Sequence, residues 1–593
     1  MAAHPDHPDA YINLGNLRAE QGLYAEARSL YERALRSYPQ GFEAHYNLGK
    51  LFARQGEPEA AIDHYRRALA LGANRGDVCN ELGGVCREIG NLEEAASCYR
   101  QAITADSQDV RAYYNLSETL KIAGRLDEAA ALDEQAVALK ADYYPALAAL
   151  VHLRQHMCNW DGIEQLWDRL RQEAIGRQDA AVTPFAMLSW TTTPEEQLTC
   201  ARAWAARELA AATAMRSQLG FTFSSRGQRN RLRVGYLSAD FRRHALAHLT
   251  AELFELHDRG QVEAIAYSCA PDDGSAIRRR LQRACDRFVD VAGESFVATA
   301  RRIHGDEVDL LVDLDGWTFG ARTRTLALRP APVQASWLGY AGTMGSDCVD
   351  YVVADPIVIP EGSERYYAES VMRLPDCYQV SDRRREVSDR TPSREECGLP
   401  SRGFVFCCFN HAYKILPDVF GRWMRILTAV PDSVLWLGEA NRWATDNLRR
   451  SAAAAGVAAE RLVFAARKPL PEYLAQFRLA DLAIDTFPYT SHTIANDALW
   501  LECPLVTCQG ETFASRVAAS ALINAGLGNL VTESLTDYEH LIIELATAPE
   551  KLQELRRKLR ESRDTCALFD TPRFVRNLER AYRTMFDTWI AKA

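Results

Sequence analysis

Hydrophobic positions divide the chain into a helical first part and a second part in which strands alternate with helices. Up to about residue 228 the apolar residues recur at helical spacing, as in segments 160–174 and 194–212. From Leu232 onward, short continuous apolar runs alternate with helical stretches; they lie at 232–238, 262–269, 309–316, 332–339 and 351–355, and then at 404–410, 433–439, 461–467, 479–485 and 504–508. Continuous apolar strands separated by helices indicate parallel sheets buried on both faces. We therefore expect two α/β lobes after a helical region.

The helical part contains a repeat of 34 residues. Four columns of residues keep this spacing over four copies: Leu14, Leu48, Leu82 and Leu116; Gly22, Gly56, Gly90 and Gly124; Ala27, Ala61, Ala95 and Ala129; and Ala34, Ala68, Ala102 and Ala136. A leucine in the first helix, a glycine at the turn and alanines in the second helix are the pattern of the tetratricopeptide repeat. Because one helix pair cannot bury its own apolar face, such pairs stack into an α/α solenoid with a concave groove. We expect four repeats over residues 1–143.

Three asparagines occupy the same position of this repeat, directly before the leucine that recurs every 34 residues. They are Asn13, Asn47 and Asn115, and the third repeat has Glu81 there instead. One interpretation is that asparagine is merely tolerated near a helix start. The other is a ladder of amides on the concave face. Since an amide side chain offers both a donor and an acceptor, such a ladder would hold an extended peptide by its backbone.

The 34-residue register ends near Leu150, which sets the remaining domain boundaries. Residues 144–228 are expected to form additional helices and a linker, with the polar stretch beginning at Ser224. The first α/β lobe is expected over 229–390 and the second over 391–593, with a highly charged stretch at 381–396 between the two series of strands. Two such lobes in tandem imply Rossmann-like sheets with a ligand cleft between them.

Composition and charge exclude several classes of protein. The 593 residues are 47% hydrophobic and 25% charged, as in an ordinary globular protein. The net charge of −10, from 69 basic and 79 acidic residues, argues against a broadly basic nucleic-acid-binding protein. No apolar run approaches the ~20 residues of a membrane span, and the first residues show no secretory signal. The 15 cysteines are scattered without zinc spacing, so we expect free thiols and a cytoplasmic protein.

Polar side chains follow three of the predicted strands, where each chain segment leads into a helix. They are His244 and His248; His411, Tyr413 and Lys414; and His492, Thr493 and Asp497. In parallel sheets, ligands bind beyond the carboxyl ends of the strands. A helix that begins there offers free N–H groups and a favourable dipole to an anion. Each residue taken alone could instead cap its helix or face solvent. The recurrence at three strand ends favours a common site.

Other motifs give weaker signals. The pair Asp313 and Asp315 after a strand resembles the acidic pair that binds a metal–nucleotide diphosphate, but so short a match arises easily by chance, and we expect no metal. The spacing of Gly339, Gly342 and Gly345 is not that of the dinucleotide fingerprint. Nicotinamide and flavin cofactors are therefore unsupported.

Longer motifs in the same order resemble O-linked N-acetylglucosamine transferases, including their bacterial members. They are LRVGYLSADFRRHALAH from residue 232, ALRPAPVQASWLGYAGTMG from 327, CCFNHAYKI from 407 and GETFASRVAAS from 510, after the tandem repeats. The resemblance covers nearly the whole chain. It implies a GT-B architecture of two Rossmann-like lobes. It also implies metal-independent transfer, with inversion, of N-acetylglucosamine from UDP-GlcNAc to Ser or Thr of proteins.

The resemblance further implies roles for individual residues. The catalytic histidine of the family corresponds to His244, near the acceptor hydroxyl, and its lysine at the diphosphate leaving group corresponds to Lys414. The expected nucleotide-sugar-binding residues are Gly339, His411, Lys468, Tyr473, His492, Thr493 and Asp497. The amide ladder would hold the protein acceptor, and no cofactor beyond the nucleotide-sugar co-substrate is expected, nor nucleic acid or membrane as a partner.

Some positions depart from the family pattern, and this keeps alternatives open. Ile494 replaces the second threonine of a His-Thr-Thr motif, Ala341 replaces a proline, and Leu470 and Gln476 replace basic residues around the nucleobase. Related branches transfer fucose from GDP-fucose or a hexose to Asn. A repeat scaffold with an inert transferase domain is a further alternative. The joint presence of His244, Lys414, His492 and Asp497 favours an active enzyme.

Overall fold

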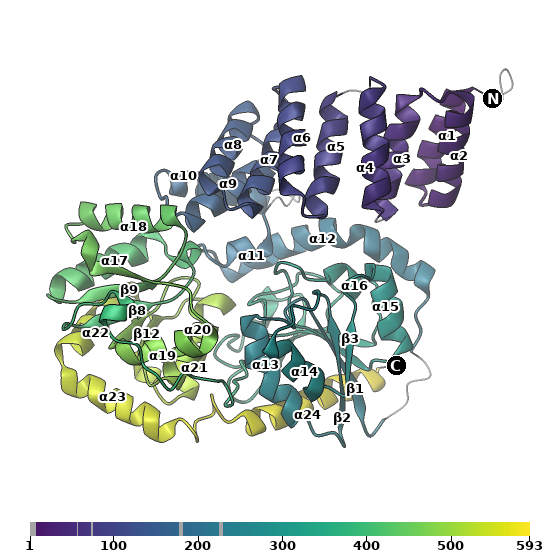
Figure 1. The fold of residues 1–593 in the computed structure, drawn as a ribbon. Helices are drawn as coiled ribbons and strands as arrows, with labels where there is room; N and C mark the ends of the chain where they lie inside the picture. Colours follow the sequence, from purple (N-terminus) through teal and green to yellow (C-terminus); the bar gives the residue numbers. More distant parts are fainter. Residues whose placement is uncertain (1–6, 56, 73–74, 177–181, 224–228, 593) are drawn as a thin grey trace. The chain divides into compact units, whose positions relative to one another are not determined.

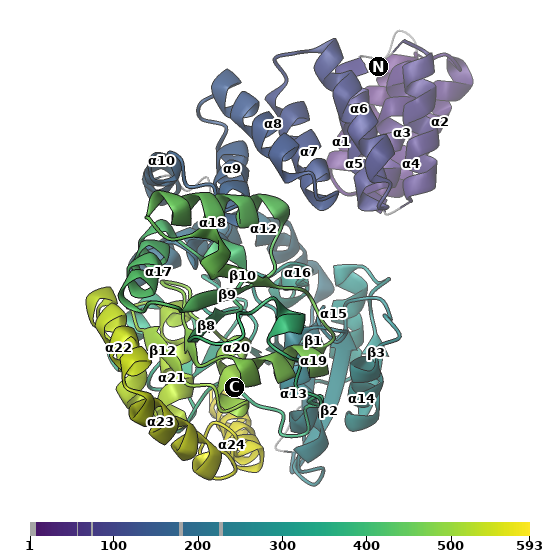
Figure 2. The ribbon, with the colours of Figure 1, turned by 60° about the vertical axis from the view of Figure 1, so that its left-hand side comes forward.

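The computed structural model describes residues 7–55, 57–72, 75–176, 182–223 and 229–592. Within these ranges the chain forms two compact units. The first comprises the residues up to 154 together with 163–170, and the second comprises 155–162 and the residues from 171 onward. Each unit is described by itself; Figures 1 and 2 show their elements from two sides.

The first unit is a stack of antiparallel helix pairs (Figure 1). Its helices are α1 (Pro8–Glu20), α2 (Tyr24–Ser37), α3 (Phe42–Gln55), α4 (Pro58–Ala70), α5 (Arg75–Glu88), α6 (Leu92–Ala105), α7 (Val110–Ile122) and α8 (Leu126–Leu139), followed at its boundary by α9 (Tyr144–His156) and α10 (Ile163–Gly176). Each odd-numbered helix up to α7 packs on the next helix of its pair, and each pair packs on the following one. The predicted tetratricopeptide repeats are confirmed.

Glycine at the turn of each pair has the backbone conformation that the repeat pattern requires. Gly22, Gly90 and Gly124 have φ angles of 76°, 81° and 76°, in the left-handed region that a side chain disfavours. Gly56, the remaining member of this column, lies outside the described residues.

A glycine–tyrosine contact fixes how closely the helices of each pair approach. Gly15, Gly49 and Gly83 in the first helices face Tyr31, Tyr65 and Tyr99 in the second, and all three tyrosines are buried. A Cβ atom added to Gly49 would lie 2.6 Å from the ring of Tyr65, inside any tolerable contact distance. The glycine therefore makes room for the ring, and the buried ring fills the space between the helices.

The fourth pair replaces this contact with a polar one. Ser117 and Asp133 stand at the glycine and tyrosine positions, and the Ser117 hydroxyl donates to Oδ2 of Asp133 at 2.7 Å. Both residues are fully buried. Burial raises the pKa of the Asp133 carboxyl to about 8, although the hydrogen bond from Ser117 opposes the shift. A hydrogen-bonded small pair thus substitutes for a large apolar ring.

The first lobe of the second unit is a parallel sheet of seven strands. Their order is β3-β2-β1-β4-β5-β6-β7. The strands are β1 (Leu232–Ser238), β2 (Val262–Ser268), β3 (Arg287–Asp290), β4 (Leu310–Asp313), β5 (Val333–Ser336), β6 (Tyr351–Ala354) and β7 (Ser370–Arg373). Five were predicted, whereas β3 and β7 were missed because these edge strands have only four residues, are partly exposed and contain charged or polar residues at their ends.

The second lobe is a parallel sheet of six strands in the order β10-β9-β8-β11-β12-β13. The strands are β8 (Val405–Cys408), β9 (Val434–Gly438), β10 (Leu462–Ala465), β11 (Leu482–Ile484), β12 (Leu505–Cys508) and β13 (Val531–Thr532). The prediction of two parallel, Rossmann-like sheets after the repeats is confirmed. Only the two-residue edge strand β13 was not anticipated.

Helices cover both sheets (Figures 1 and 2). The helices of the first lobe are α13 (Ala245–Leu256), α14 (Ala276–Ala284), α15 (Phe296–Gly305) and α16 (Thr323–Ala327). Helix α12 (Pro194–Leu219), which follows the short α11 (Pro184–Met187), also packs on this lobe. Those of the second lobe are α17 (Pro417–Ala429), α18 (Arg442–Ala454), α19 (Leu470–Gln476), α20 (Thr493–Trp500), α21 (Val517–Asn524), α22 (Leu535–Thr547) and α23 (Pro549–Ser562).

The last helix, α24 (Thr571–Ile590), returns from the second lobe to the first. Phe574, Leu578 and Tyr582 enter the core of the first lobe, where Phe574 stacks on Trp337 at 5.8 Å between ring centroids. The buried Glu579 carboxylate lies 2.9 Å from Nδ1 of His257. Although the sequence assigns this helix to the second half of the chain, it completes the first lobe.

A short segment near the start of the second unit is bound to the second lobe. Asn441 and Asn447, on or next to α18, donate to the backbone carbonyls of His156 and Met157 at 2.7 and 2.8 Å. The ring of Trp160 lies 5.2 Å from that of Phe420. The segment 155–162 is thus part of the second lobe, whereas α12, further along the chain, belongs to the first.

Two adjacent glycines of α5 allow the packing of the repeats to be tested. We expect Gly83→Ala to destabilise the third pair by about 1–3 kcal/mol through overpacking, because its Cβ would lie 2.8 Å from the Tyr99 ring. The matched control is Gly84→Ala, whose Cβ would meet only the Tyr99 hydroxyl at 3.8 Å, so that helix propensity should make it neutral or stabilising. Hydrogen exchange of α5 and α6 in the full chain measures both effects. Equal protection in the two variants would contradict the packing argument.

The buried carboxyl of the fourth pair predicts a pH-dependent stability. The folded-state pKa of Asp133, about 8, exceeds the value of ~3.9 in an unfolded chain, so its ionisation opposes folding. The carboxyl's contribution to stability is therefore complete below pH ~4 and is lost as the pH rises through about 8. Asp133→Asn should remove this loss. In the variant, α7 and α8 should be better protected against hydrogen exchange than in the wild type, and the difference should grow from pH 5 to pH 8. A difference that does not change with pH would contradict the assignment.

Candidate active site

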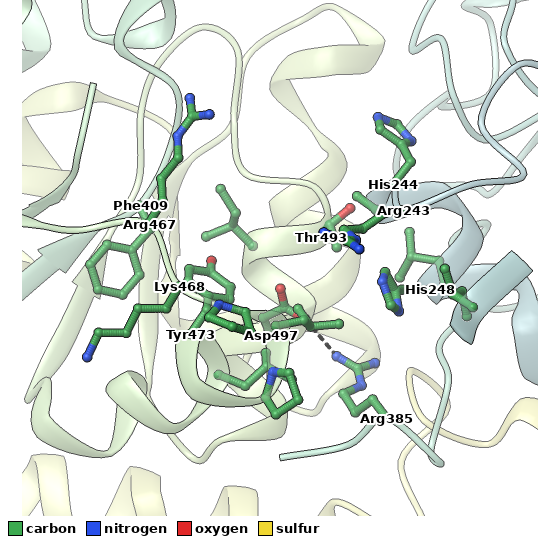
Figure 3. A pocket seen from close by; sticks show the side chains of 18 of the residues that line it. Arg243, His244, His248, Arg385, Phe409, Arg467, Lys468, Tyr473, Thr493 and Asp497 are labelled. Carbon is green, nitrogen blue, oxygen red and sulfur yellow. Dashed lines mark hydrogen bonds and ion pairs between the residues drawn. The ribbon is translucent and has the colours of Figure 1, made fainter. Parts of the chain in front are cut away.

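A cavity of about 930 Å³ lies between the two lobes, at the carboxyl ends of their strands. Figure 3 shows the side chains around it. The first lobe contributes residues in the loop after β1 and the first turns of α13, namely Arg243, His244 and His248. The second lobe contributes residues that follow β8, β10 and β11, namely Phe409, His411, Arg467, Lys468, Tyr473, Thr493 and Asp497. The structure therefore gathers His244 and all the expected nucleotide-sugar-binding residues except Gly339 and His492 around this one cavity. Those two line a smaller, neighbouring cavity, which His244 and Thr493 also line.

The loop that begins α20 is held by the buried carboxylate of Asp485, at the end of β11. The backbone N–H and hydroxyl of Ser491 donate to its Oδ1 at 2.8 and 2.6 Å, and the Thr507 hydroxyl donates to its Oδ2 at 2.7 Å. The Asn410 amide also donates to Oδ1, at 3.3 Å. Three strand ends, those of β8, β11 and β12, are thus tied to one side chain.

Lys414 lies beneath this loop and is nearly fully buried. Its Nζ donates to the backbone carbonyl of Thr490 at 3.0 Å and lies 3.7 Å from the centre of the Tyr489 ring. Burial lowers the pKa of its amine to about 8, while the Asp485 carboxylate raises it. Lys414 is not among the lining residues of either cavity; its charge sits behind the loop that leads into α20.

The first turn of α20 presents several polar groups toward the cavities. His492 is the residue before the helix, and Thr493 begins it. Within the part of the chain that the structure describes, Nε2 of His492 and both polar side-chain atoms of the buried Asn496 have no hydrogen-bond partner. Burial and the nearby Lys414 keep the pKa of His492 well below its usual range, so the imidazole is neutral. Asn496 lines neither cavity, so the groups that the helix start offers to an anion are its free N–H groups, the Thr493 hydroxyl and Nε2 of His492.

Asp497, one turn further along α20, is paired with an arginine that the sequence interpretation missed. Nη1 of Arg385 donates to Oδ1 of Asp497 at 2.8 Å (Figure 3). The guanidinium carbon also lies 5.2 Å from the centre of the Trp500 ring. Arg385 also donates to the hydroxyl of Ser381 at 2.8 Å. Burial raises the pKa of Asp497 to about 6, and Arg385 opposes this shift. Part of the stretch 381–396, which looks like a solvated connection, is therefore buried in the site.

His244 lines both cavities from the first lobe. Its Nδ1 lies 3.2 Å from Oδ2 of Asp240 and 3.3 Å from the backbone nitrogen of Leu246. Burial lowers the pKa of the imidazole, and the Asp240 carboxylate opposes this effect. The ring is therefore mostly neutral at pH 7. Because the Leu246 N–H donates to Nδ1, the neutral ring carries its proton on Nε2 in this arrangement. A move of the proton to Nδ1, toward Asp240, would leave Nε2 as the basic atom.

On the second lobe, His411 is neutral as well. Burial lowers its pKa to about 4, with Lys414 and Arg467 adding to the shift. Lys468 and Tyr473 line the cavity near α19, on the side away from His244 (Figure 3).

The smaller cavity has a volume of about 320 Å³ and lies beside Gly339. The backbone nitrogen of Gly339 donates to the carbonyl of Trp337 at 3.1 Å, and Leu338 between them has a φ of 78°. This is a γ-turn in the strained left-handed region, which is costly for leucine. A Cβ at Gly339 would lie 2.0 Å from the carbonyl oxygen of Leu314, so no other residue fits there. Strain and close backbone approach at a cavity make this turn a candidate functional element.

Gln379 lines the same cavity and was not predicted. Its side chain is 2% exposed, and among the described residues nothing pairs with its Nε2. An unpaired buried donor costs about 1–3 kcal/mol, so a ligand acceptor here would be favourable. No local sequence signal marks this residue, because a single glutamine after a strand is unremarkable by itself.

The pair Asp313 and Asp315 has a structural role. Asp315 accepts hydrogen bonds from the Ser238 hydroxyl and the Ala239 nitrogen, both at 2.6 Å, and Asp313 accepts one from the Gly316 nitrogen at 2.9 Å. Both carboxyls are buried, and neither lines the two cavities. Among the residues with described placement, no group of three or more His, Cys, Asp and Glu side chains is arranged to hold a metal ion.

The asparagines of the repeats lie on α1, α3 and α7, the first helices of their pairs. Asn13 is exposed, and Asn47 and Asn115 are half-buried. Their amides are therefore accessible, while their role as an acceptor groove stays a prediction. Within the described ranges, no helix has the length and apolar character needed to cross a membrane.

Comparisons with known proteins agree with this architecture. The profile of Glycosyl transferase family 41 matches residues 211–391 and 388–578, and tetratricopeptide profiles match 2–41, 12–76 and 83–121. A solved structure of a Thermobaculum terrenum O-GlcNAc transferase mutant is 28% identical and covers 93% of this chain and 98% of its own, with a TM-score of 0.68.

Curated relatives carry related names. A probable UDP-N-acetylglucosamine–peptide N-acetylglucosaminyltransferase, SEC, of Arabidopsis thaliana is 35% identical over 457 residues, which cover 74% of this chain and 46% of the relative. The corresponding Caenorhabditis elegans transferase is 26% identical, over 59% of this chain and 40% of its own length. The chain thus spans less than half the length of these relatives. The family profile nevertheless covers more than half of the chain, which therefore belongs to glycosyl transferase family 41.

Proposed function

We propose that the protein transfers N-acetylglucosamine from UDP-GlcNAc to Ser or Thr hydroxyls of proteins, with inversion and without a metal ion. The names of the curated relatives and of the solved bacterial transferase support this donor and acceptor over GDP-fucose, a hexose on Asn, or an inert scaffold. The observation that carries the proposal is the convergence of strand-end residues from both lobes on one cavity of about 930 Å³, a volume suited to a nucleotide sugar.

The proposed donor site follows the cavity from α19 to α20. The nucleobase lies near Lys468 and Tyr473, and the ribose near Asp497, whose carboxylate Arg385 keeps in place. The diphosphate meets the N–H groups at the start of α20 and the Thr493 hydroxyl. Because Ile494 brings no hydroxyl, the backbone donors carry more of this interaction.

The proposed reaction needs charge stabilisation at the leaving group and a place for the acceptor's proton. As the bond between the anomeric carbon and the diphosphate breaks, negative charge grows on the phosphate oxygens. The α20 dipole and the buried Lys414 ammonium behind its first turn oppose this charge. The acceptor oxygen attacks from the opposite face of the sugar, and the neutral His244 beside Asp240 is the proposed proton acceptor.

The proposed sugar subsite is the smaller cavity beside the Leu338–Gly339 turn. The unpaired Nε2 atoms of Gln379 and His492 are available there to sugar oxygens. The acceptor protein is proposed to bind along Asn13, Asn47 and Asn115 of the repeats. The protein is further proposed to act in the cytoplasm and to need no cofactor.

Mass spectrometry tests the proposed function directly. The full chain is incubated with a lysate of its own cells and, in separate reactions, with UDP-GlcNAc, UDP-glucose or GDP-fucose. We expect N-acetylhexosamine on Ser or Thr only with UDP-GlcNAc, in the presence of a chelator as well as in its absence. Transfer from another donor, or to Asn, would replace the proposal with one of the alternatives, and no transfer from any donor would favour the scaffold.

Lys414 provides a test of leaving-group stabilisation. Lys414→Met should lower kcat by roughly 10²–10³, as the loss of a positioned electrostatic group does. Because the amine is protonated below its pKa of about 8, wild-type kcat/KM should fall as the pH rises through that value, and the variant should lack this limb. Steady-state kinetics from pH 6 to pH 10 measure both effects. Near-wild-type turnover in the variant would refute the role, and Lys121→Met, in the repeats, controls for the loss of a lysine elsewhere.

Gln379 provides a test of the sugar subsite. Gln379→Leu keeps the volume but removes the buried Nε2, so we expect KM for UDP-GlcNAc to rise about 10-fold, the equivalent of one net hydrogen bond. Affinity for UDP, which lacks the sugar, should stay unchanged in calorimetry. A parallel loss of UDP affinity would show that the substitution disturbs the nucleotide site instead.

A further inference from the structure

In the described part of the chain, Phe319 is the most exposed of all large apolar side chains. Its side chain is 94% exposed, whereas Ile523, the next such residue in the second unit, is 43% exposed. A phenyl group in water is unfavourable relative to a buried one. An isolated apolar residue on a surface needs no explanation by itself. A function for Phe319 must therefore be argued from where the residue lies and from the contacts that hold its loop.

The loop that carries Phe319 is anchored by hydrogen bonds of the residues just before the exposed ring. The buried Asp315 accepts two hydrogen bonds from the end of β1, and the indole of Trp317 donates to the carbonyl of Met344 at 3.1 Å. The Thr318 hydroxyl donates to the carbonyl of Asp315 at 2.9 Å. Gly316 and Gly320, with φ angles of 60° and 86°, turn the chain before and after the ring. The buried Asp313 and Asp315 thus hold this loop in place through hydrogen bonds.

Phe319 stands at the mouth of the smaller cavity. It lines this cavity together with His244, His492 and Gly339, the residues around the proposed point of transfer. Because its ring is almost wholly exposed while it also lines the cavity, it lies where the cavity opens to solvent. Phe185 and Leu338 add apolar surface to the same wall.

The occupant that best fits this surface is the acceptor polypeptide. The nucleotide of the donor is polar and anionic, and the larger cavity with its arginine, lysine and histidine side chains is suited to it. A phenyl ring offers neither charge nor a hydrogen-bond donor. The acceptor must approach His244 from solvent, and the residues flanking its hydroxyl then pass the mouth of the smaller cavity.

We propose that Phe319 is a contact surface for an apolar side chain of the acceptor, one that neighbours the modified Ser or Thr in its sequence. The inference rests on the proposed function and adds to it a preference for aliphatic, proline or aromatic residues beside the acceptor hydroxyl. The hydrogen bonds of the loop support this role, because a backbone that is already held in place loses little conformational freedom when an acceptor binds.

A peptide library tests the inference. Peptides with one central Ser and single flanking positions varied in turn are glycosylated by the wild type, Phe319→Ala, Phe319→Tyr and the control Ile523→Ala. We expect the wild type to favour apolar residues at one flanking position. Phe319→Ala should lower kcat/KM for those peptides about 10-fold and leave polar-flanked peptides unchanged, whereas Phe319→Tyr and Ile523→Ala should keep the preference. Hydrolysis of UDP-GlcNAc by water and the affinity for UDP should be the same in all four proteins.

Several results would overturn the inference. One is an unchanged flanking preference in Phe319→Ala, and another is an equal loss on all peptides and on donor hydrolysis, which would show damage to the site. Concentration-dependent self-association that Phe319→Ala abolishes in sedimentation would assign the ring to a second copy of the chain instead.

A binding measurement separates this inference from the proposed function. With p-benzoylphenylalanine in place of Phe319 and UDP present, apolar-flanked peptides should cross-link at this position more than polar-flanked ones. If the wild type transfers sugar to no peptide, the proposed function fails, yet the cross-linking still decides whether position 319 contacts an apolar side chain. Equal or absent cross-linking of both peptide classes would refute the contact.

Discussion

The buried carboxylate of Asp485 is the interaction on which the site depends. It receives hydrogen bonds from Ser491 and Thr507 and so fixes the path of the chain between β11 and α20. That path places the Thr490 carbonyl over the Lys414 ammonium and presents the start of α20 to the cavity. Burial raises the pKa of Asp485, while its hydrogen bonds and Lys414 oppose the shift. The hydrogen-bonded network around Asp485 inside the second lobe thus sets the position of His492 and Asn496, whose side chains carry unpaired polar atoms in the described structure.

The unpartnered groups contrast sharply with this network. Nε2 of His492 and the amide of Asn496 are buried without protein partners in the described structure, one turn from the well-satisfied Asp485 loop. Buried polar groups are normally paired, so Nε2 of His492, which belongs to a residue lining the smaller cavity, is suited to a ligand that supplies the missing partner. Preorganisation of this kind reduces the reorganisation needed when charge develops.

Local patterns in the sequence predicted most of the architecture. The 34-residue period and the apolar runs identify the repeats and the central strands, because both depend on spacing along the chain. Polar residues after strands predict the cavity, because parallel strands bring their carboxyl ends to one edge. The edge strands β3 and β7 were not predicted, since each has only four residues, is partly exposed and lacks a continuous apolar run.

Long-range pairings were not predictable in this way. Arg385 lies in a run of arginines that looks solvated, and only the fold shows that it is buried against Asp497, 112 residues away. The amphipathic pattern of α24 indicates that one face is buried, but not that the first lobe receives it. Gln379 stands out only because no described group pairs with its amide. Such features depend on which parts of the chain meet, and a single sequence does not contain that information.

The path of the chain through the second unit has a mechanical consequence. The chain passes between the lobes three times: from the segment 155–162 on the second lobe to α12 on the first, through the stretch after β7, and again before α24. Two bodies joined by three segments of chain are more restricted in their relative motion than two bodies joined by one linker. Any opening of the cavity must be accommodated by all three connections together. Cutting α24 from the first lobe would release one restraint and at the same time uncover the apolar surface on which Phe574 and Tyr582 rest.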